Sequence, residues 1–118
     1  MLVAGLVAYA NAAKVSFLDV PEETLAAHGA VSEETARAMA EGARRRVGVD
    51  YALSMTGIAG PGGGTEAKPV GTVFVGLASP RGVQVRKFMN PFDRETFKYV
   101  TSQQALEMLR REILASGG

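Results

Sequence analysis

Tyr9 and Lys14 are the first two side chains in the sequence that could act together in proton transfer. Tyr9 closes an apolar run that starts at Met1, and Lys14 follows five residues later, across an expected turn. A lysine in a desolvated pocket, its pKa lowered from about 10.4 to about 7–8, can act as a general base beside a phenol that relays protons. Outside such a pocket, Lys14 is a surface lysine and Tyr9 an amphipathic residue at a strand end.

A glycine-rich segment after Thr56 is the second candidate for chemistry. Five of the fourteen glycines fall between residues 57 and 64, namely Gly57, Gly60, Gly62, Gly63 and Gly64. Such a cluster lets bare backbone N–H groups approach an anionic ligand such as phosphate. The spacing matches neither a Walker A motif nor a dinucleotide-binding fingerprint, because Lys68 is followed by Pro69 and a further strand is expected. The pattern alone is equally compatible with a flexible hairpin connection.

Three groups of charged or titratable residues complete the search. Arg94 and Lys98 lie one turn apart at the start of an expected helix, where their repulsion favours an anionic ligand. His28 precedes Gly29 at an expected helix end and is interpreted as a capping residue. The basic run 44–46 is interpreted as the exposed end of a helix rather than an anion site.

The elements that must position these residues alternate between strands and helices. Strands are expected over residues 1–9, 51–55, 71–79 and 83–88, with an irregular stretch beginning at Thr56. Helices are expected after Pro21, Ser32 and Asp93, with Val47 on the inward face of the second, and a short helical segment is expected within 11–17. Val83, Val85 and Phe88 are interpreted as the buried positions of one hairpin strand. The order of elements predicts an α/β fold with a mixed sheet covered by helices.

Composition excludes several classes of protein. The 118 residues carry 13 basic and 12 acidic side chains, so the formal charge of +1 gives no support to nucleic-acid binding. The chain has no cysteine and a single histidine, which excludes disulfide scaffolds, cysteine nucleophiles and polyhistidine metal sites. The apolar start lacks a basic n-region and is too short to span a membrane. We therefore expect one cytoplasmic domain with no metal, membrane or nucleic-acid partner.

Several of these segments resemble the CinA C-terminal domain family, the competence-damage-inducible relatives. The likeness begins with Tyr-x-Asn-x-x-Lys at residues 9–14 and continues through residues 28–32, 56–63 and 68–73 to Asp93 and Arg94. It follows the family order over nearly the whole chain, and the Thr-Gly-Ile-Ala-Gly-Pro string at 56–61 is highly specific.

The resemblance implies a three-layer α/β/α domain that hydrolyses the carboxamide of nicotinamide mononucleotide. The products are nicotinic acid mononucleotide and ammonia, in pyridine-nucleotide salvage, with no cofactor. Carried over residue by residue, Lys14 is the general base and Tyr9 relays or stabilises protons. The implied substrate-binding residues are Asn11, Thr56, Gly57, Gly60, Gly62, Gly63, Arg94 and Lys98.

The sequence departs from the family in one segment. The family's serine nucleophile lies in a Glu-Ser-x-Thr-Gly-Gly segment that has no counterpart in these 118 residues. We therefore expect residues 1–118 to form a single domain that is N-terminally truncated relative to the family and lacks its first strand and helix. The apolar face and sheet edge so uncovered favour a homo-oligomer. Activity of the chain alone is then expected to be impaired, and the alternative is a non-catalytic nucleotide-binding or dimerisation module of a larger CinA-like protein.

Overall fold

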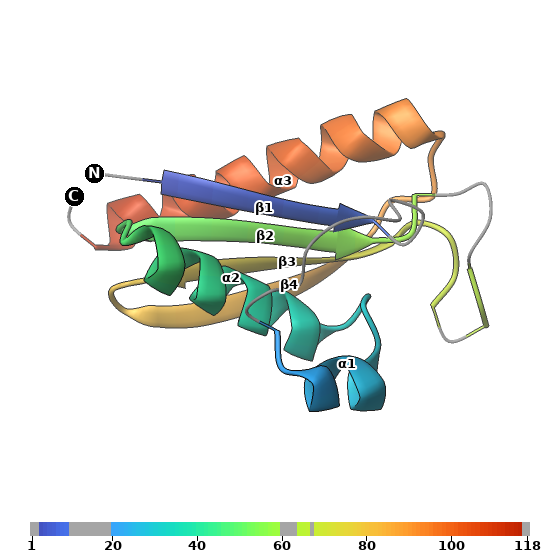
Figure 1. The fold of residues 1–118 in the computed structure, drawn as a ribbon. Helices are drawn as coiled ribbons and strands as arrows, with labels where there is room; N and C mark the ends of the chain where they lie inside the picture. The colour runs from blue at the N-terminus through green and yellow to red at the C-terminus, as the bar shows by residue number, and fades with distance from the viewer. Residues whose placement is uncertain (1–2, 10–19, 60–63, 67, 117–118) are drawn as a thin grey trace.

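The fold is a four-stranded mixed sheet with helices on both faces (Figure 1). The computed structural model describes residues 3–9 as backbone, and residues 20–59, 64–66 and 68–116 with their side chains. The strands are β1 (Val3–Tyr9), β2 (Tyr51–Gly57), β3 (Thr72–Ser79) and β4 (Gly82–Met89). The helices are α1 (Glu22–His28), α2 (Glu33–Val47) and α3 (Arg94–Ala115). The expected helical segment within 11–17 lies outside the described residues.

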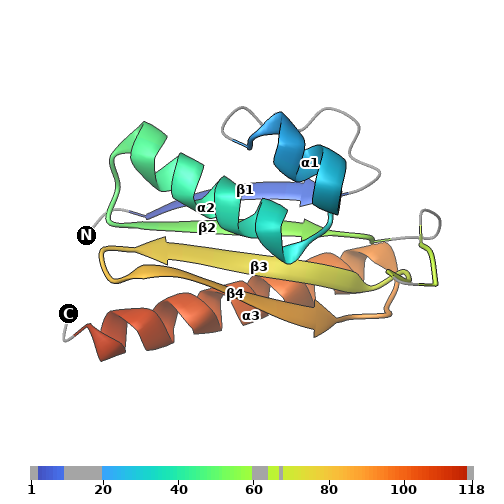
Figure 2. The same cartoon turned by 90° about the horizontal axis from the view of Figure 1, so that it is seen from below.

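The sheet has the order β1-β2-β3-β4, with β1 parallel to β2 and the other neighbours antiparallel. Helices α1 and α2 lie on one face and α3 lies on the other, as Figure 2 shows from below. The expected α/β class with a mixed sheet between helical layers is confirmed. Among the described residues, no helix combines the length and the apolar character needed to cross a bilayer.

The two long helices begin where the sequence places hydrogen-bonding caps. The Ser32 hydroxyl accepts a hydrogen bond from the Thr35 amide at the start of α2, at 3.1 Å. The Asp93 carboxylate accepts one from the Thr96 amide at the start of α3, at 3.0 Å. These bonds satisfy amides that have no partner within the helix. Gly48 ends α2 in the left-handed conformation, with φ of 72°.

The two faces of the sheet differ in side-chain size. On the α3 face, large side chains from β2 and β3 pack against Phe97 and Met108. On the α2 face, the sheet presents small residues, and Ser54 donates a hydrogen bond to the Ala36 carbonyl at 2.7 Å. A Cβ atom at Gly76 would lie 2.7 Å from that same carbonyl oxygen. The α2 backbone is therefore close enough to the sheet that Gly76 leaves no room for a side chain.

Three sequence expectations about the elements are wrong in detail. β2 continues through Thr56 and Gly57, because β3 pairs with the glycine-containing end of the strand. Val47 is 60% exposed, because α2 has passed the sheet by its last turn. Phe88 packs on the α3 face whereas Val83 packs on the α2 face, since an odd spacing in a strand reverses the side-chain direction.

Candidate functional site

The candidate site lies at the end of the sheet where β1, β2 and β4 finish and α3 begins (Figures 1 and 2). We call this the loop end, and we call the opposite end, with the β3–β4 turn and the last turn of α3, the hairpin end. The parallel register places Tyr9, the last residue of β1, beside Gly57, the last residue of β2. Strands β1 and β2 therefore end at the same edge of the sheet, where α/β folds commonly bind ligands.

Several of the predicted site residues lie outside the described residues. These are Asn11, Lys14, Gly60, Gly62 and Gly63, together with the side chain of Tyr9. The backbone of Tyr9 and the residues Thr56, Gly57, Arg94 and Lys98 are described, and all of these lie at the loop end.

Thr56 holds two segments together at the loop end. Its side chain is 1% exposed, and its hydroxyl donates a hydrogen bond to the Ala30 carbonyl at 2.7 Å. Ala30 belongs to residues 29–32, the connector between α1 and α2. The hydroxyl thus joins the end of β2 to the connector, and any contribution of Thr56 to a ligand site acts through the backbone that it fixes.

Gly57 is required by packing against the neighbouring strand. A Cβ atom at this position would lie 2.9 Å from the Thr72 carbonyl oxygen and 2.9 Å from the Val73 Cβ atom. Such a contact forces the backbone to shift, because neither of these atoms can move aside easily. Pairing of β2 with β3 is therefore enough to explain why this position is a glycine, without any requirement from a ligand.

Backbone hydrogen bonds close the glycine-rich segment at its base. The Ile58 amide donates to the Thr72 carbonyl at 2.9 Å, and the Gly71 amide donates to the Ile58 carbonyl at 2.7 Å. Between these points, the Thr65 amide donates to the Lys68 carbonyl at 2.9 Å, and the Thr65 hydroxyl accepts from the Lys68 amide at 3.0 Å. We call residues 58–71 the glycine loop. It begins and ends on paired backbone.

Lys68 was not among the predicted site residues, yet it connects the glycine loop to α1. Its ammonium donates a hydrogen bond to the His28 carbonyl at 3.0 Å. The His28 ring interacts with α2, where its Nδ1 lies 3.6 Å from a carboxylate oxygen of Glu34. His28 is the last residue of α1, but Gly29 is the C-cap residue, and its amide donates to the Leu25 carbonyl; a capping role of the His28 side chain stays a prediction. A contact between residues 28 and 68 has no local sequence signal, because 40 residues separate the partners.

Arg94 and Lys98 occupy the first turns of α3, at the loop end (Figure 1). Arg94 is half-buried, and the Lys98 ammonium lies 3.9 Å from the Glu95 carboxylate. Hydrogen bonds from the Thr96 amide and hydroxyl lower the pKa of the Asp93 carboxyl. The anionic side chains of Asp93 and Glu95 thus offset part of the repulsion expected between the two cations.

Asn90 fixes the approach to α3 and was also missed by the sequence analysis. It is 3% exposed, and its side-chain amide nitrogen donates to the Thr101 hydroxyl at 3.1 Å and to the side-chain oxygen of Gln104 at 2.8 Å. Its backbone amide donates to the Gly71 carbonyl at 2.8 Å. Gly71 has φ of 101° and no space for a Cβ beside Pro91. One asparagine therefore joins the glycine loop, the end of β4 and α3; the only local signal is a turn-forming Asn-Pro pair.

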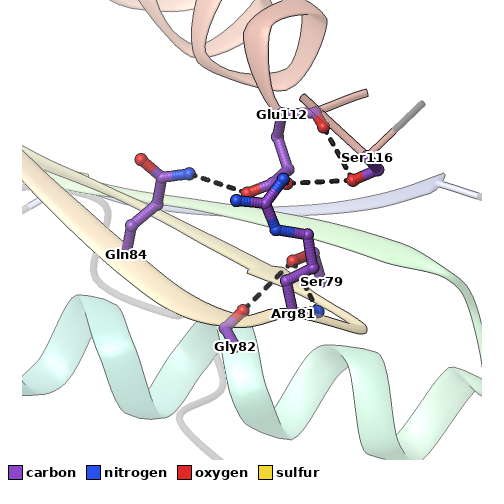
Figure 3. Close-up of polar contacts among 6 residues, drawn as sticks. All are labelled: Ser79, Arg81, Gly82, Gln84, Glu112 and Ser116. Atoms are coloured by element: carbon purple, nitrogen blue, oxygen red, sulfur yellow. Dashed lines mark hydrogen bonds and ion pairs between the residues drawn. The ribbon is translucent and has the colours of Figure 1, made fainter. Parts of the chain in front are cut away.

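At the hairpin end, polar contacts surround the carboxylate of Glu112 (Figure 3). Glu112 is 9% exposed. Its carboxylate accepts a hydrogen bond from the Gln84 amide at 3.2 Å and one from the Ser116 hydroxyl at 3.0 Å. The Arg81 guanidinium lies 3.5 Å from the same group. These contacts attach the last turn of α3 to the β3–β4 hairpin and satisfy a charge that would otherwise be costly to bury.

The comparisons with known proteins agree with this architecture. The family model described as the CinA C-terminal domain matches residues 1–113, so the chain belongs to the CinA C-terminal domain family. A CinA-like protein of Geotalea daltonii is 55% identical over 111 residues, which cover 94% of this chain and 27% of the relative. A CinA-like protein of Synechocystis is 48% identical over 115 residues, with 95% and 28% covered. The chain thus spans about a quarter of the length of these curated relatives.

Solved structures show the same fold. The competence/damage inducible protein CihA from Agrobacterium tumefaciens is 41% identical, with a TM-score of 0.77 over 80% of this chain and 59% of that one. The competence damage-inducible protein A from Klebsiella pneumoniae is 32% identical, with a TM-score of 0.78 over 84% of this chain and 62% of that one. The family resemblance identified from the sequence motifs is therefore confirmed.

Proposed function

We propose that the chain forms the substrate-binding and proton-transfer part of an amidohydrolase that acts on nicotinamide mononucleotide. In the reaction, the C–N bond of the carboxamide breaks, and water supplies the oxygen of the new carboxylate and the hydrogen that leaves with ammonia. Family membership supports the proposal, as does the presence of the Tyr-x-Asn-x-x-Lys string at residues 9–14.

The observation that carries the proposal is the pairing of Tyr9 with Gly57 on adjacent parallel strands. This register ends β1 and β2 at one edge of the sheet, the edge where α3 begins. In the proposed site, Lys14 removes a proton from the nucleophile and Tyr9 relays it. Backbone amides of the glycine loop bind the substrate, and Arg94 pairs with the phosphate.

Thr56 and Lys98 take more limited roles in this proposal. The Thr56 hydroxyl is occupied by the Ala30 carbonyl, so the residue positions the loop backbone rather than the substrate itself. Lys98 adds positive charge one turn beyond Arg94, but an ammonium cannot form the bidentate contact that a guanidinium makes with phosphate.

Ammonia release from nicotinamide mononucleotide tests the proposed reaction. It is measured on the 118-residue chain and on the chain with a Glu-Ser-x-Thr-Gly-Gly segment of the family fused ahead of it. Turnover is expected in the fused form, and Lys14→Ala should lower its kcat by roughly 10²- to 10⁴-fold, the usual contribution of a general base. Lys87→Ala, which removes an exposed lysine of β4, is the matched control. Equal kcat values for the two variants would remove Lys14 from the mechanism.

Arg94→Ala tests the phosphate contact separately. Loss of a charge-assisted hydrogen bond is expected to raise KM by about 10- to 100-fold, with a smaller effect on kcat. An unaltered KM would contradict the assignment.

A nucleotide-binding module without turnover is the second candidate. It is favoured by the positions of the described serines, because four of their hydroxyls bond to protein groups away from the proposed site or within its scaffold. These are Ser32, Ser54, Ser79 and Ser116. Calorimetric binding of nicotinamide mononucleotide without ammonia release, in both forms of the chain, would favour this candidate over the amidohydrolase.

A further inference from the structure

Three consecutive backbone carbonyls at the junction of α1 and α2 each accept a side-chain hydrogen bond. The His28 carbonyl accepts from the Lys68 ammonium at 3.0 Å. The Gly29 carbonyl accepts from the Thr35 hydroxyl at 2.6 Å and the Ser32 hydroxyl at 3.0 Å. The Ala30 carbonyl accepts from the Thr56 hydroxyl at 2.7 Å. Four side chains therefore fix one short stretch of backbone.

The four donors have two different origins. Ser32 and Thr35 belong to the start of α2 and hold the junction to its own helix. Thr56 and Lys68 come from far along the chain, and they stand on either side of the glycine-rich residues 57–64. The junction of α1 and α2 is therefore the common support for the two flanks of that segment.

The position of Lys68 suits this contact in three ways. The Lys68 backbone is set by its two hydrogen bonds with Thr65. The ammonium meets a carbonyl in the last turn of α1, where positive charge is favourable and carbonyl groups lack partners within the helix. Gly29, with φ of 80°, turns the chain at this point, and a Cβ there would lie 3.8 Å from the ammonium. The junction therefore leaves room for the lysine.

We propose that Lys68 is a positioning residue of the substrate site, which fixes the flank of the glycine loop formed by residues 64–66 and 68–71 against the His28 carbonyl before a ligand binds. This inference rests on the proposed function of the loop as the substrate cradle. Prior arrangement raises affinity because the ordering cost is met in the free protein. Lys68 acts through backbone and has no contact with the reacting atoms.

Hydrogen exchange in the ligand-free chain tests the positioning role directly. A lysine that only contacts the ligand leaves ligand-free exchange unchanged, whereas a positioning lysine protects its neighbours. In Lys68→Met, amide exchange of residues 64–72 is expected to rise at least about threefold, while exchange in β3 beyond residue 73 and in α2 stays unchanged. Lys68→Arg, which keeps a long cationic donor, should restore most of the protection. Lys87→Met is the matched control and should behave as the unmodified chain.

Calorimetry with nicotinamide mononucleotide then connects the position of the loop to binding. Lys68→Met is expected to raise Kd about tenfold with the melting temperature unchanged, and Lys68→Arg should recover affinity. If the amides of Lys68→Met exchange at the same rates as those of the unmodified chain, the positioning role is wrong. If they exchange faster but the Kd is unchanged, the position of the loop does not matter for binding. If the unmodified chain does not bind the nucleotide, the proposed function fails, whereas the exchange experiment still decides whether Lys68 fixes the loop.

Discussion

The two ends of the sheet solve the same structural problem with different kinds of contact. At the hairpin end, side chains bond to one another around the Glu112 carboxylate, and a tight turn joins β3 to β4 (Figure 3). At the loop end, Asn90 also bonds to side chains of α3, but the side chains of Thr56 and Lys68 bond to backbone carbonyls 26 and 40 residues away in sequence. Contacts of the first kind hold helix to strand, whereas those of the second kind hold loops in place.

The difference indicates how stability and ligand binding are distributed in this molecule. Loss of a hairpin-end contact should lower the stability of the domain and leave the loop end intact. Loss of a loop-end contact should change the position of the glycine loop and weaken nucleotide binding, whether or not the stability of the domain falls. Measuring unfolding and nucleotide binding on the same variants therefore separates the two ends.

Asn90→Ala should have the largest effect, because Asn90 joins three segments at the loop end. Removing its buried amide leaves the groups on Thr101 and Gln104 without their partner and opens a small cavity. The free energy of unfolding should fall by about 2 to 3 kcal/mol, measured by urea denaturation. Nucleotide affinity should fall as well, because Asn90 holds the start of α3, where Arg94 lies four residues further along the chain. A stability loss with unchanged affinity would remove Asn90 from the support of the loop end.

Glu112→Ala should lower the free energy of unfolding by about 1 to 2 kcal/mol through loss of buried polar contacts. Its effect on nucleotide Kd should be negligible, because the residue lies at the other end of α3. Glu112→Gln keeps an acceptor for Gln84 and Ser116, and should recover part of the stability. A higher nucleotide Kd in Glu112→Ala would show that the two ends of the sheet are coupled, and would contradict the separation of stability from ligand binding.

Thr56→Val should reduce stability by about 1 kcal/mol, because a methyl group replaces the hydroxyl that donates to the Ala30 carbonyl. The control Thr56→Ser retains the donor. Calorimetry should detect weaker nucleotide binding in the valine variant and near-normal binding in the serine variant. Equal binding in the two variants would mean that the Ala30 contact supports only the fold.

Glu107→Gln should have the smallest effect, a small loss of stability near neutral pH that disappears at acid pH. Hydrogen bonds from Arg110 and then Arg111 lower the pKa of the Glu107 carboxyl to about 2. Since the folded pKa is below the ordinary value of 4.5, its contribution to stability is present above pH 4.5 and is lost as the pH falls toward 2. Solvent screening keeps this contribution small. The melting temperatures of the unmodified chain and of Glu107→Gln should converge near pH 2. A constant difference between them from pH 7 to pH 2 would contradict the stabilising role of the ionised Glu107 carboxylate.

The sequence predicts most of the elements because their signals are local. Ser32 and Asp93 identify the starts of the long helices, and Gly48 identifies the end of α2. The expectation that Phe88 shares a face with Val83 is wrong, because five residues separate them and an odd spacing in a strand reverses the side-chain direction. Thr56 and Gly57 were not expected in β2 because glycine-rich sequence disfavours a strand, whereas pairing with β3 overrides that preference.

The candidate site is less predictable from the sequence than the fold. The family motif identifies Thr56 and Arg94, and the structure places both at the loop end. Nothing near Lys68 or Asn90 indicates their partners, because these contacts form only once β2, α1 and α3 are assembled. The roles of Asn11, Lys14 and the central glycines stay predictions.

The pair of backbone hydrogen bonds between Ile58 and residues 71–72 has a practical consequence for engineering. It sets the alignment of β2 with β3 at the point where the glycine loop departs, so that alignment does not depend on what the loop contains. We therefore expect that the sheet keeps its register when the segment between these two points is replaced by one of another length or composition.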